Sequence, residues 1–169
     1  MTIPRGRLLV LVALIAVAAA CGRGISLEQD LEITDVSTGW YDDGIDPTTT
    51  WNHMVPSVTF KLKNNGSEGV NAVRLTLAFW VDGDDGEKDS KLVRGIGDES
   101  LAPGASTDEI TVRGNVGYNV EGPRADLFAR SAFRDWTVKL FASRGGALVP
   151  KGEFKIERRI IYQNAGPGQ

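Results

Sequence analysis

The chain has 169 residues, of which 41% are hydrophobic and 24% are charged, and its formal net charge at pH 7 is −3. This length and composition are enough for one globular domain with a hydrophobic core. The slight excess of acidic residues argues against an extended basic surface of the kind that binds nucleic acid or anionic membranes.

The N-terminal residues have the layout of a secretory signal. Arg5 and Arg7 precede an uncharged apolar run over residues 8–20 that ends in small residues, and this order is typical of exported proteins. As a helix the run is about 20 Å long, shorter than the roughly 30 Å hydrocarbon core of a bilayer. We therefore expect residues 1–20 to be a signal peptide rather than a membrane-spanning helix.

Cleavage before Cys21, the only cysteine of the chain, fits two enzymes. Ala18 and Ala20 satisfy the small-x-small pattern of ordinary signal peptidase. Residues 18–21, Ala-Ala-Ala-Cys, also resemble the lipobox of bacterial lipoproteins, in which the cysteine carries acyl chains such as palmitate and becomes the first mature residue. Because a lone exported thiol has no disulfide partner in its own chain, we favour lipidation of Cys21.

The lipobox resemblance implies a location. It implies a lipid-anchored protein of the cell envelope, and Gly22 after the cysteine favours the outer membrane, with the domain facing the periplasm. Residues 21–29 are then a short polar tether of at most roughly 30 Å.

Alternation of apolar and polar residues predicts β-strands over most of residues 30–163. It is clearest at Val58, Phe60 and Leu62 and again over residues 73–81, where each strand has one apolar and one solvated face. The turn residues 64–67, Asn-Asn-Gly-Ser, predict that these two strands are hairpin neighbours. Further strands are predicted at residues 30–36, 90–96, 108–114, 135–143 and 153–162.

About seven strands separated by turn residues predict a single all-β domain, an immunoglobulin-like antiparallel β-sandwich. One connection, residues 115–134, is longer than the others. Pro123 followed by the helix-forming residues 125–130 predicts a short helix across one end of the sandwich. Residues 164–169 are expected to be a disordered tail.

Residues from about Val58 to Val112 resemble the small immunoglobulin-like domains, FxLYD-type and relatives, of bacterial envelope lipoproteins. The resemblance lies in turn signatures and not in active-site residues. The chain departs from that pattern at residues 39–54 and in the long connection 115–134. The matching positions are Asn65, Gly66, Phe79, Trp80, Asp82, Gly83, Leu101, Pro103, Gly104 and Ser106.

The acidic stretch at residues 81–90 is a candidate calcium site, because carboxylate oxygens are ligands that Ca²⁺ accepts. Its spacing does not follow an EF-hand loop, and a solvated turn between strands explains the same composition. The candidate ligands are Asp82, Asp84, Asp85, Glu87 and Asp89.

Trp40, Tyr41 and Trp51 flank an acidic segment and could form an aromatic platform for a glycan or a protein partner. Packing at the end of a small sandwich is the alternative explanation of the same residues. Further along, Arg158 and Arg159 interrupt the alternation of the last predicted strand, which indicates a β-bulge, an edge-strand guard or an interaction hot spot.

No motif of a catalytic nucleophile, phosphate loop, CxxC pair or HExxH metal site is present, and His53 is the only histidine, so we expect no enzyme and no cofactor. Converging carboxylates remain the one catalytic alternative. The sequence predicts a non-catalytic interaction or accessory module whose partners are the membrane, through Cys21, and another envelope protein, but no nucleic acid. A glycan- or calcium-binding module is the alternative.

Overall fold

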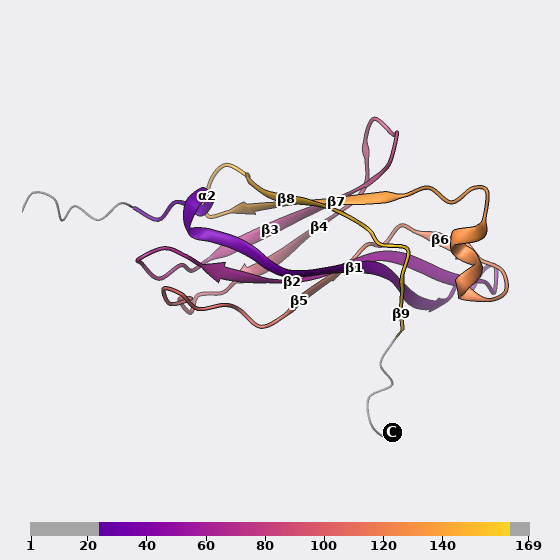
Figure 1. The fold of residues 1–169 in the computed structure, drawn as a ribbon, viewed down its shortest axis with the longest axis horizontal. Helices are drawn as coiled ribbons and strands as arrows, with labels where there is room; N and C mark the ends of the chain where they lie inside the picture. The colour runs from indigo at the N-terminus through magenta and orange to yellow at the C-terminus, as the bar shows by residue number, and fades with distance from the viewer. Residues whose placement is uncertain (1–23, 163–169) are drawn as a thin grey trace, which may run out of the picture.

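The computed structural model describes residues 24–162, which form two β-sheets packed face to face (Figure 1). The five-stranded sheet contains β1 (Leu31–Ile45), β2 (Asn52–Asn64), β5 (Ile110–Arg113), β6 (Tyr118–Val120) and β9 (Ile160–Ile161). The four-stranded sheet contains β3 (Val73–Val81), β4 (Glu87–Ile96), β7 (Trp136–Ser143) and β8 (Val149–Lys155). Two short helices, α2 (Leu27–Asp30) and the 3₁₀ helix η2 (Arg124–Ala129), complete the fold.

The predicted all-β sandwich is confirmed. Its strand orders are β5-β2-β1-β9, with β6 also paired to β2, and β4-β3-β7-β8. All neighbours are antiparallel except β1 and β9, which run parallel. The expected signal peptide, the lipidated Cys21 and the tail at residues 164–169 lie outside the described residues.

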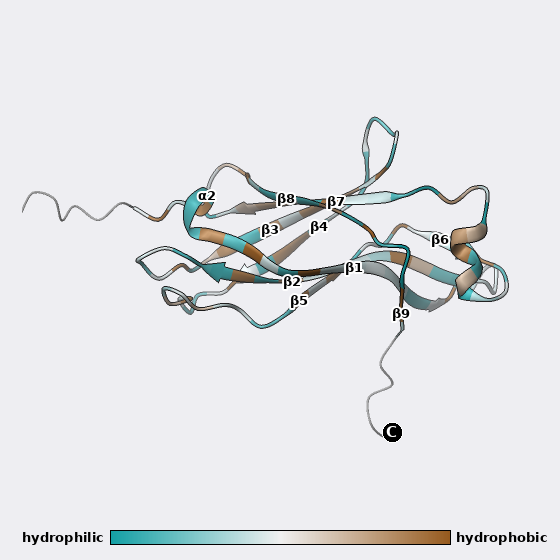
Figure 2. Cartoon of the chain, viewed as in Figure 1, coloured by the Kyte–Doolittle hydropathy of each residue, from teal (hydrophilic) through white to brown (hydrophobic). Residues whose placement is uncertain are grey.

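The core lies between the sheets and follows from the alternation of the strands (Figure 2). Phe60 in β2 and Phe79 in β3 are fully buried from opposite sheets, as are the leucines two residues away on the same strand faces. Burial of this apolar surface is the main stabilisation of such a domain.

The predicted hairpin between β2 and β3 is wrong, because these strands belong to different sheets. The Asn64 amide is buried and donates hydrogen bonds to the carbonyls of Glu68 (2.8 Å) and Leu101 (2.9 Å), while its oxygen accepts one from the Gly66 N–H. These bonds turn the chain from one sheet toward the other. Turn residues reveal that the chain bends, but not to which sheet it goes next.

Residues 39–54, where the sequence departs from the pattern it otherwise resembles, form the end of β1, a turn and the start of β2. Tyr41 in β1 lies opposite Val55 in β2, and the hairpin closes through a turn at residues 46–51. The helix predicted after Pro123 is confirmed as η2, and Arg124 ties it to β1 through an ion pair with Asp42.

The domain is elongated, with the two helices at opposite ends (Figure 1). At the N-terminal end, the Lys151 ammonium of β8 donates a hydrogen bond of 2.8 Å to the Leu27 carbonyl of α2. We call this end the tether end. The opposite end, formed by residues 46–51 and 115–134, is the loop end. In the described part of the chain, no helix is both long and apolar enough to cross a bilayer.

Candidate interaction site at the loop end

A cluster of aromatic rings joins the two sheets at the loop end. Trp40 of β1 is fully buried, and its ring centroid lies 5.4 Å from Tyr118, 5.4 Å from Phe133 and 5.7 Å from Trp136. The contacts are tilted or edge-to-face, the arrangements that aromatic quadrupoles prefer. Trp40 is therefore part of the core, as the packing interpretation expected, and not a surface platform.

Tyr41 is also unavailable as an exposed platform, although it lies on the opposite face of β1. Its side chain is only 6% exposed, and the guanidinium carbon of Arg113 lies 3.4 Å from its ring centroid. Of the three candidate platform aromatics, only Trp51 is partly exposed. For the other two the packing interpretation holds, because β1 is buried on both faces at this point.

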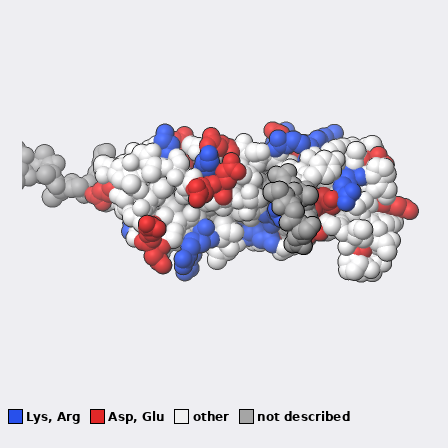
Figure 3. All heavy atoms as spheres, turned by 90° about the horizontal axis from the view of Figure 1, so that it is seen from below, with Lys and Arg blue, Asp and Glu red and all other residues white. Residues whose placement is uncertain are grey.

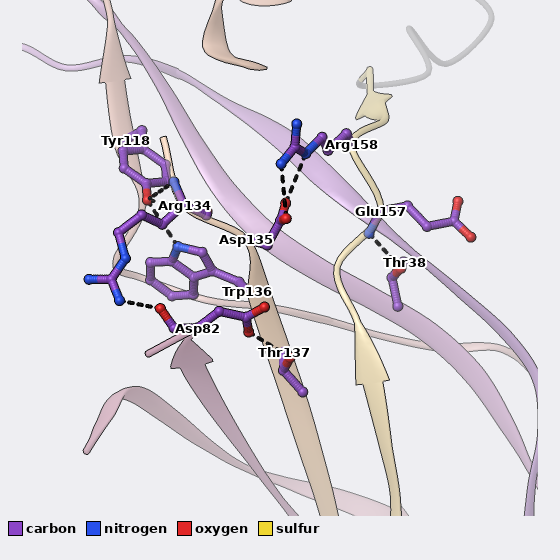
Figure 4. A network of polar contacts seen from close by, with 9 residues as sticks. All are labelled: Thr38, Asp82, Tyr118, Arg134, Asp135, Trp136, Thr137, Glu157 and Arg158. Carbon is purple, nitrogen blue, oxygen red and sulfur yellow. Dashed lines mark hydrogen bonds and ion pairs between the residues drawn. The ribbon is translucent and has the colours of Figure 1, made fainter. Parts of the chain in front are cut away.

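The Tyr118 hydroxyl is the polar centre of the cluster (Figure 4). It accepts hydrogen bonds from the Trp136 indole N–H and the Arg134 backbone N–H, both at 3.2 Å. The Arg134 guanidinium then reaches the β3–β4 hairpin, where it pairs with the Asp84 carboxylate at 2.6 Å. Hydrogen bonds to the Tyr118 hydroxyl and the ion pair between Arg134 and Asp84 thus connect the loop end to the β3–β4 hairpin.

The five candidate calcium ligands do not converge. Asp84 binds Lys88 and Arg134, and hydrogen bonds from these two side chains lower the pKa of its carboxyl group. Asp82 accepts a hydrogen bond from the Thr137 hydroxyl at 3.1 Å, and Asp89 accepts one from the Asn115 N–H. The remaining two candidates are exposed, Asp85 and Glu87.

Nowhere in residues 24–162 do three or more His, Cys, Asp or Glu side chains gather closely enough to hold a metal ion. The carboxylates of the 82–89 hairpin instead bind neighbouring cations, a hydroxyl and backbone amides. The solvated-turn interpretation describes this segment, and it explains the same composition through hydrogen bonds within the fold.

A small cavity of about 210 Å³ opens beside the aromatic cluster. Its lining includes Tyr118, Phe133, Asn119 and Arg130. The Arg130 guanidinium donates a hydrogen bond of 2.8 Å to the Asn119 carbonyl and lies 5.9 Å from the Trp51 ring centroid. The loop end therefore combines a partly exposed indole, a cation and an aromatic-walled cavity.

The turn that carries Trp51 is itself well held. The Asp46 carboxylate accepts hydrogen bonds from the backbone N–H groups of Thr48 (2.8 Å) and Thr49 (2.9 Å). The bond from Thr49 is the first cause of the lowered pKa of Asp46, followed by the bond from Thr48. Asn119 adds a side-chain hydrogen bond to Asp46 at 3.2 Å, so the turn is tied to β6.

Arg158 and Arg159 lie where the chain leaves one sheet for the other. Arg158 forms a two-point contact with Asp135, at 2.8 and 2.9 Å, while Arg159 donates to the Ser37 hydroxyl (2.6 Å) and the Thr38 carbonyl (2.7 Å). The predicted strand at residues 153–162 is therefore two strands, β8 and β9, on different sheets. The interrupted alternation marks this crossing and not a bulge within one strand.

The contacts of the crossing segment, residues 156–159, also shift the pKa values of two side chains. A hydrogen bond from Arg158 lowers the pKa of Asp135, and the same bond raises the pKa of Arg158. The Glu157 N–H donates to the Thr38 hydroxyl at 3.0 Å (Figure 4). Both arginines thus have structural partners, although their side chains are largely exposed.

Sequence reasoning missed the residues that organise the loop end, Tyr118, Phe133, Arg134 and Trp136. The available signal was the concentration of aromatic and basic residues in and after the long connection 115–134. On the face seen in Figure 3, acidic and basic side chains are interspersed, so that view carries no extended basic tract.

No protein-family model matches the chain, and no curated protein matches it. Among solved structures, a Bordetella pertussis protein provisionally named ApaA matches with a TM-score of 0.45 and 17% identity, over 76% of this chain and 94% of that one. The ligand-binding region of serine-glutamate repeat protein A from Enterococcus faecium matches with a TM-score of 0.28 and 15% identity, over 70% and 90%.

Proposed function

We propose that this chain is a lipid-anchored protein of the bacterial cell envelope whose β-sandwich is a non-catalytic interaction module. The observation that carries the proposal is the placement of the two ends. The tether end follows directly on the residues after Cys21, and the loop end lies at the far end of the elongated domain (Figure 1). A domain anchored through Cys21 would present its loop end away from the membrane.

The composition of the loop end suits a protein partner. Ile45 is 66% exposed at the base of the turn that carries Trp51, and Arg130 lies next to that indole. Tryptophan and arginine are enriched among the residues that dominate binding energy in protein interfaces. The hydrogen bonds that the Asp46 carboxylate accepts, including the one from Asn119, hold this turn in place, which lowers the entropy lost on binding.

Site-specific photocrosslinking in intact cells tests the docking face. A photoreactive phenylalanine derivative replaces Trp51 in one variant and Leu148 in a matched control, because Leu148 is 54% exposed in the β7–β8 loop at the tether end. We expect a discrete envelope-protein adduct from position 51 and none from position 148. Equal adducts from the two positions, or none from position 51, would contradict the docking face.

The anchor is tested separately. Cells that express the full chain are labelled with a fatty-acid analogue, with Cys21→Ala as the comparison. We expect labelled protein in the membrane fraction and loss of the label in the variant. Each buried CH₂ contributes about 0.8 kcal/mol, so two or three acyl chains would hold the domain stably. If Cys21→Ala still carries the label, the proposed anchor is refuted, whereas the proposed docking face is not affected by that result.

A glycan is the second candidate ligand, favoured by the cavity of about 210 Å³ with Tyr118 and Phe133 in its lining. Both rings pack on Trp40, whose buried Nε1 has no hydrogen-bond partner among the described residues. Thermal unfolding with cell-wall disaccharides tests this candidate, since a ligand at 100 times its Kd adds about 2.7 kcal/mol. No shift with the wild type, or an equal shift in Trp51→Ala/Arg130→Ala, would exclude this site.

A further inference from the structure

Two arginines stand directly opposite each other on the outer face of the four-stranded sheet. Arg74 of β3 pairs in register with Arg94 of β4, and both side chains are exposed. A guanidinium is always charged at neutral pH. Like charges directly across two strands destabilise the sheet, so this pair opposes the fold unless an anion lies between or beside the two groups.

A β-bulge produces the pairing. Val73 lies opposite Ile96 and the next residue, Arg74, lies opposite Arg94, which leaves Gly95 as the extra residue of β4. Without the bulge Gly95 would face Arg74, and Arg94 would turn toward the core. Bulges commonly redirect a side chain near a functional site. Glycine is needed here because a Cβ at position 95 would lie 2.9 Å from two buried leucine side chains.

Among the described residues the two guanidinium groups are poorly neutralised. The nearest carboxylate oxygen to Arg94 belongs to Asp98, at 3.9 Å, and these two side chains are 73% and 91% exposed. An ion pair that is this exposed and this long contributes little to the stability of the fold. No hydrogen bond or ion pair joins the Arg74 guanidinium to another residue in the described range.

Both arginines line a groove of about 580 Å³. Its lining also includes Asp98, from the segment after β4, and Ser143, which pairs with Arg74 from the β7 side. Gly145, also in the lining, leaves open space where a side chain would stand. The groove can therefore admit a group that reaches both guanidinium groups.

We infer that this groove binds a phosphate-bearing anion, with Arg74 and Arg94 donating hydrogen bonds to the phosphate oxygens. Two planar guanidinium groups offer several N–H donors and two positive charges, which match a tetrahedral phosphate better than a single carboxylate. The groove is larger than a phosphate alone, so it leaves room for the organic group of an ester.

Two sources could supply this chemistry, a phospholipid headgroup or a soluble phosphate ester. The groove lies where β7 meets β8, beside the strand that binds α2, and so at the tether end. A lipid source rests on the proposed anchor at Cys21, because the anchor would bring this end to the membrane surface. The anion site itself rests only on the arginine pair, the bulge and the groove.

The test is thermal unfolding of the full chain in non-ionic detergent, in sodium phosphate and in sodium chloride of equal ionic strength. We expect phosphate at about ten times its Kd to raise the midpoint by about 4 °C. Arg74→Gln/Arg94→Gln should lose this rise, and its midpoint in chloride should equal or exceed that of the wild type because the repulsion is gone. Arg74→Gln alone should lose most of the rise.

The control is Lys61→Gln/Arg113→Gln, which removes the same charge from the other sheet and should keep the phosphate rise. The inference is overturned if the wild type gains nothing from phosphate, if Arg74→Gln/Arg94→Gln keeps the gain, or if both double variants lose it. Glycerophosphoglycerol, the deacylated headgroup of phosphatidylglycerol, distinguishes the sources. An Arg74-dependent rise at lower concentrations than inorganic phosphate supports a lipid headgroup, and the reverse order supports a soluble ester.

Discussion

Removing one hydroxyl, in Tyr118→Phe, should loosen the loop end measurably. The Trp136 side chain is 3% exposed and its indole N–H donates to that hydroxyl at 3.2 Å, so the variant leaves a buried donor without its partner. A lost partner of this kind costs about 1–3 kcal/mol. The Arg134 backbone N–H also loses its bond but can turn to solvent, so we expect a loss of about 1–2 kcal/mol.

The measurement is urea unfolding of the full chain in non-ionic detergent, followed by tryptophan fluorescence and treated as two-state. The midpoint should fall while the slope stays the same, and the thermal midpoint should fall by about 3–6 °C. Tyr162→Phe is the matched control, because Tyr162 is 62% exposed and should change stability by less than about 0.5 kcal/mol. Equal losses in the two variants would refute the role of the Tyr118 hydroxyl.

Two further predictions concern the crossing segment and the bulge. Because Arg158 lowers the pKa of Asp135 below its ordinary value of 3.8, their contact stabilises the fold above that pH and is lost as the pH falls through the lowered value. Arg158→Gln should therefore be less stable than the wild type at pH 7 in denaturant titrations, and the difference should shrink as the pH falls below 3.8. A difference that does not depend on pH would contradict this. Gly95→Ala places a Cβ 2.9 Å from side-chain carbons of Leu62 and Leu75 and should cost about 1–3 kcal/mol in the same assay, whereas Gly86→Ala, in open space, is its control.

The loop end shows how far residue types alone could indicate a site. Aromatic residues near an acidic segment pointed to this end of the sandwich as a candidate site, and the partly exposed Trp51 lies there. Trp40 and Tyr41 follow the packing alternative and form no exposed platform, because both faces of β1 are covered at that point. The burial of a strand residue depends on which segments pack against each face of the strand, and these segments come from distant parts of the chain.

At the crossing segment too, the partners of Arg158 and Arg159 could not be predicted from the local sequence. Their polarity in an apolar strand was a correct sign of irregularity, but its cause is a change of sheet. Only the folded chain places Asp135 opposite Arg158, and the Thr38 carbonyl within reach of Arg159. Such partners are far apart in sequence, and no local pattern specifies them.

The sequence by itself determined the sandwich, because alternation of apolar and polar residues is a local property that each strand carries alone. It also located the short helix after Pro123. Tertiary structure alone decided which strands share a sheet, as the separation of β2 from β3 demonstrates. It likewise decided that a bulge sets Arg74 opposite Arg94, because register is set by pairing between strands and a shift of one residue turns a side chain to the other face.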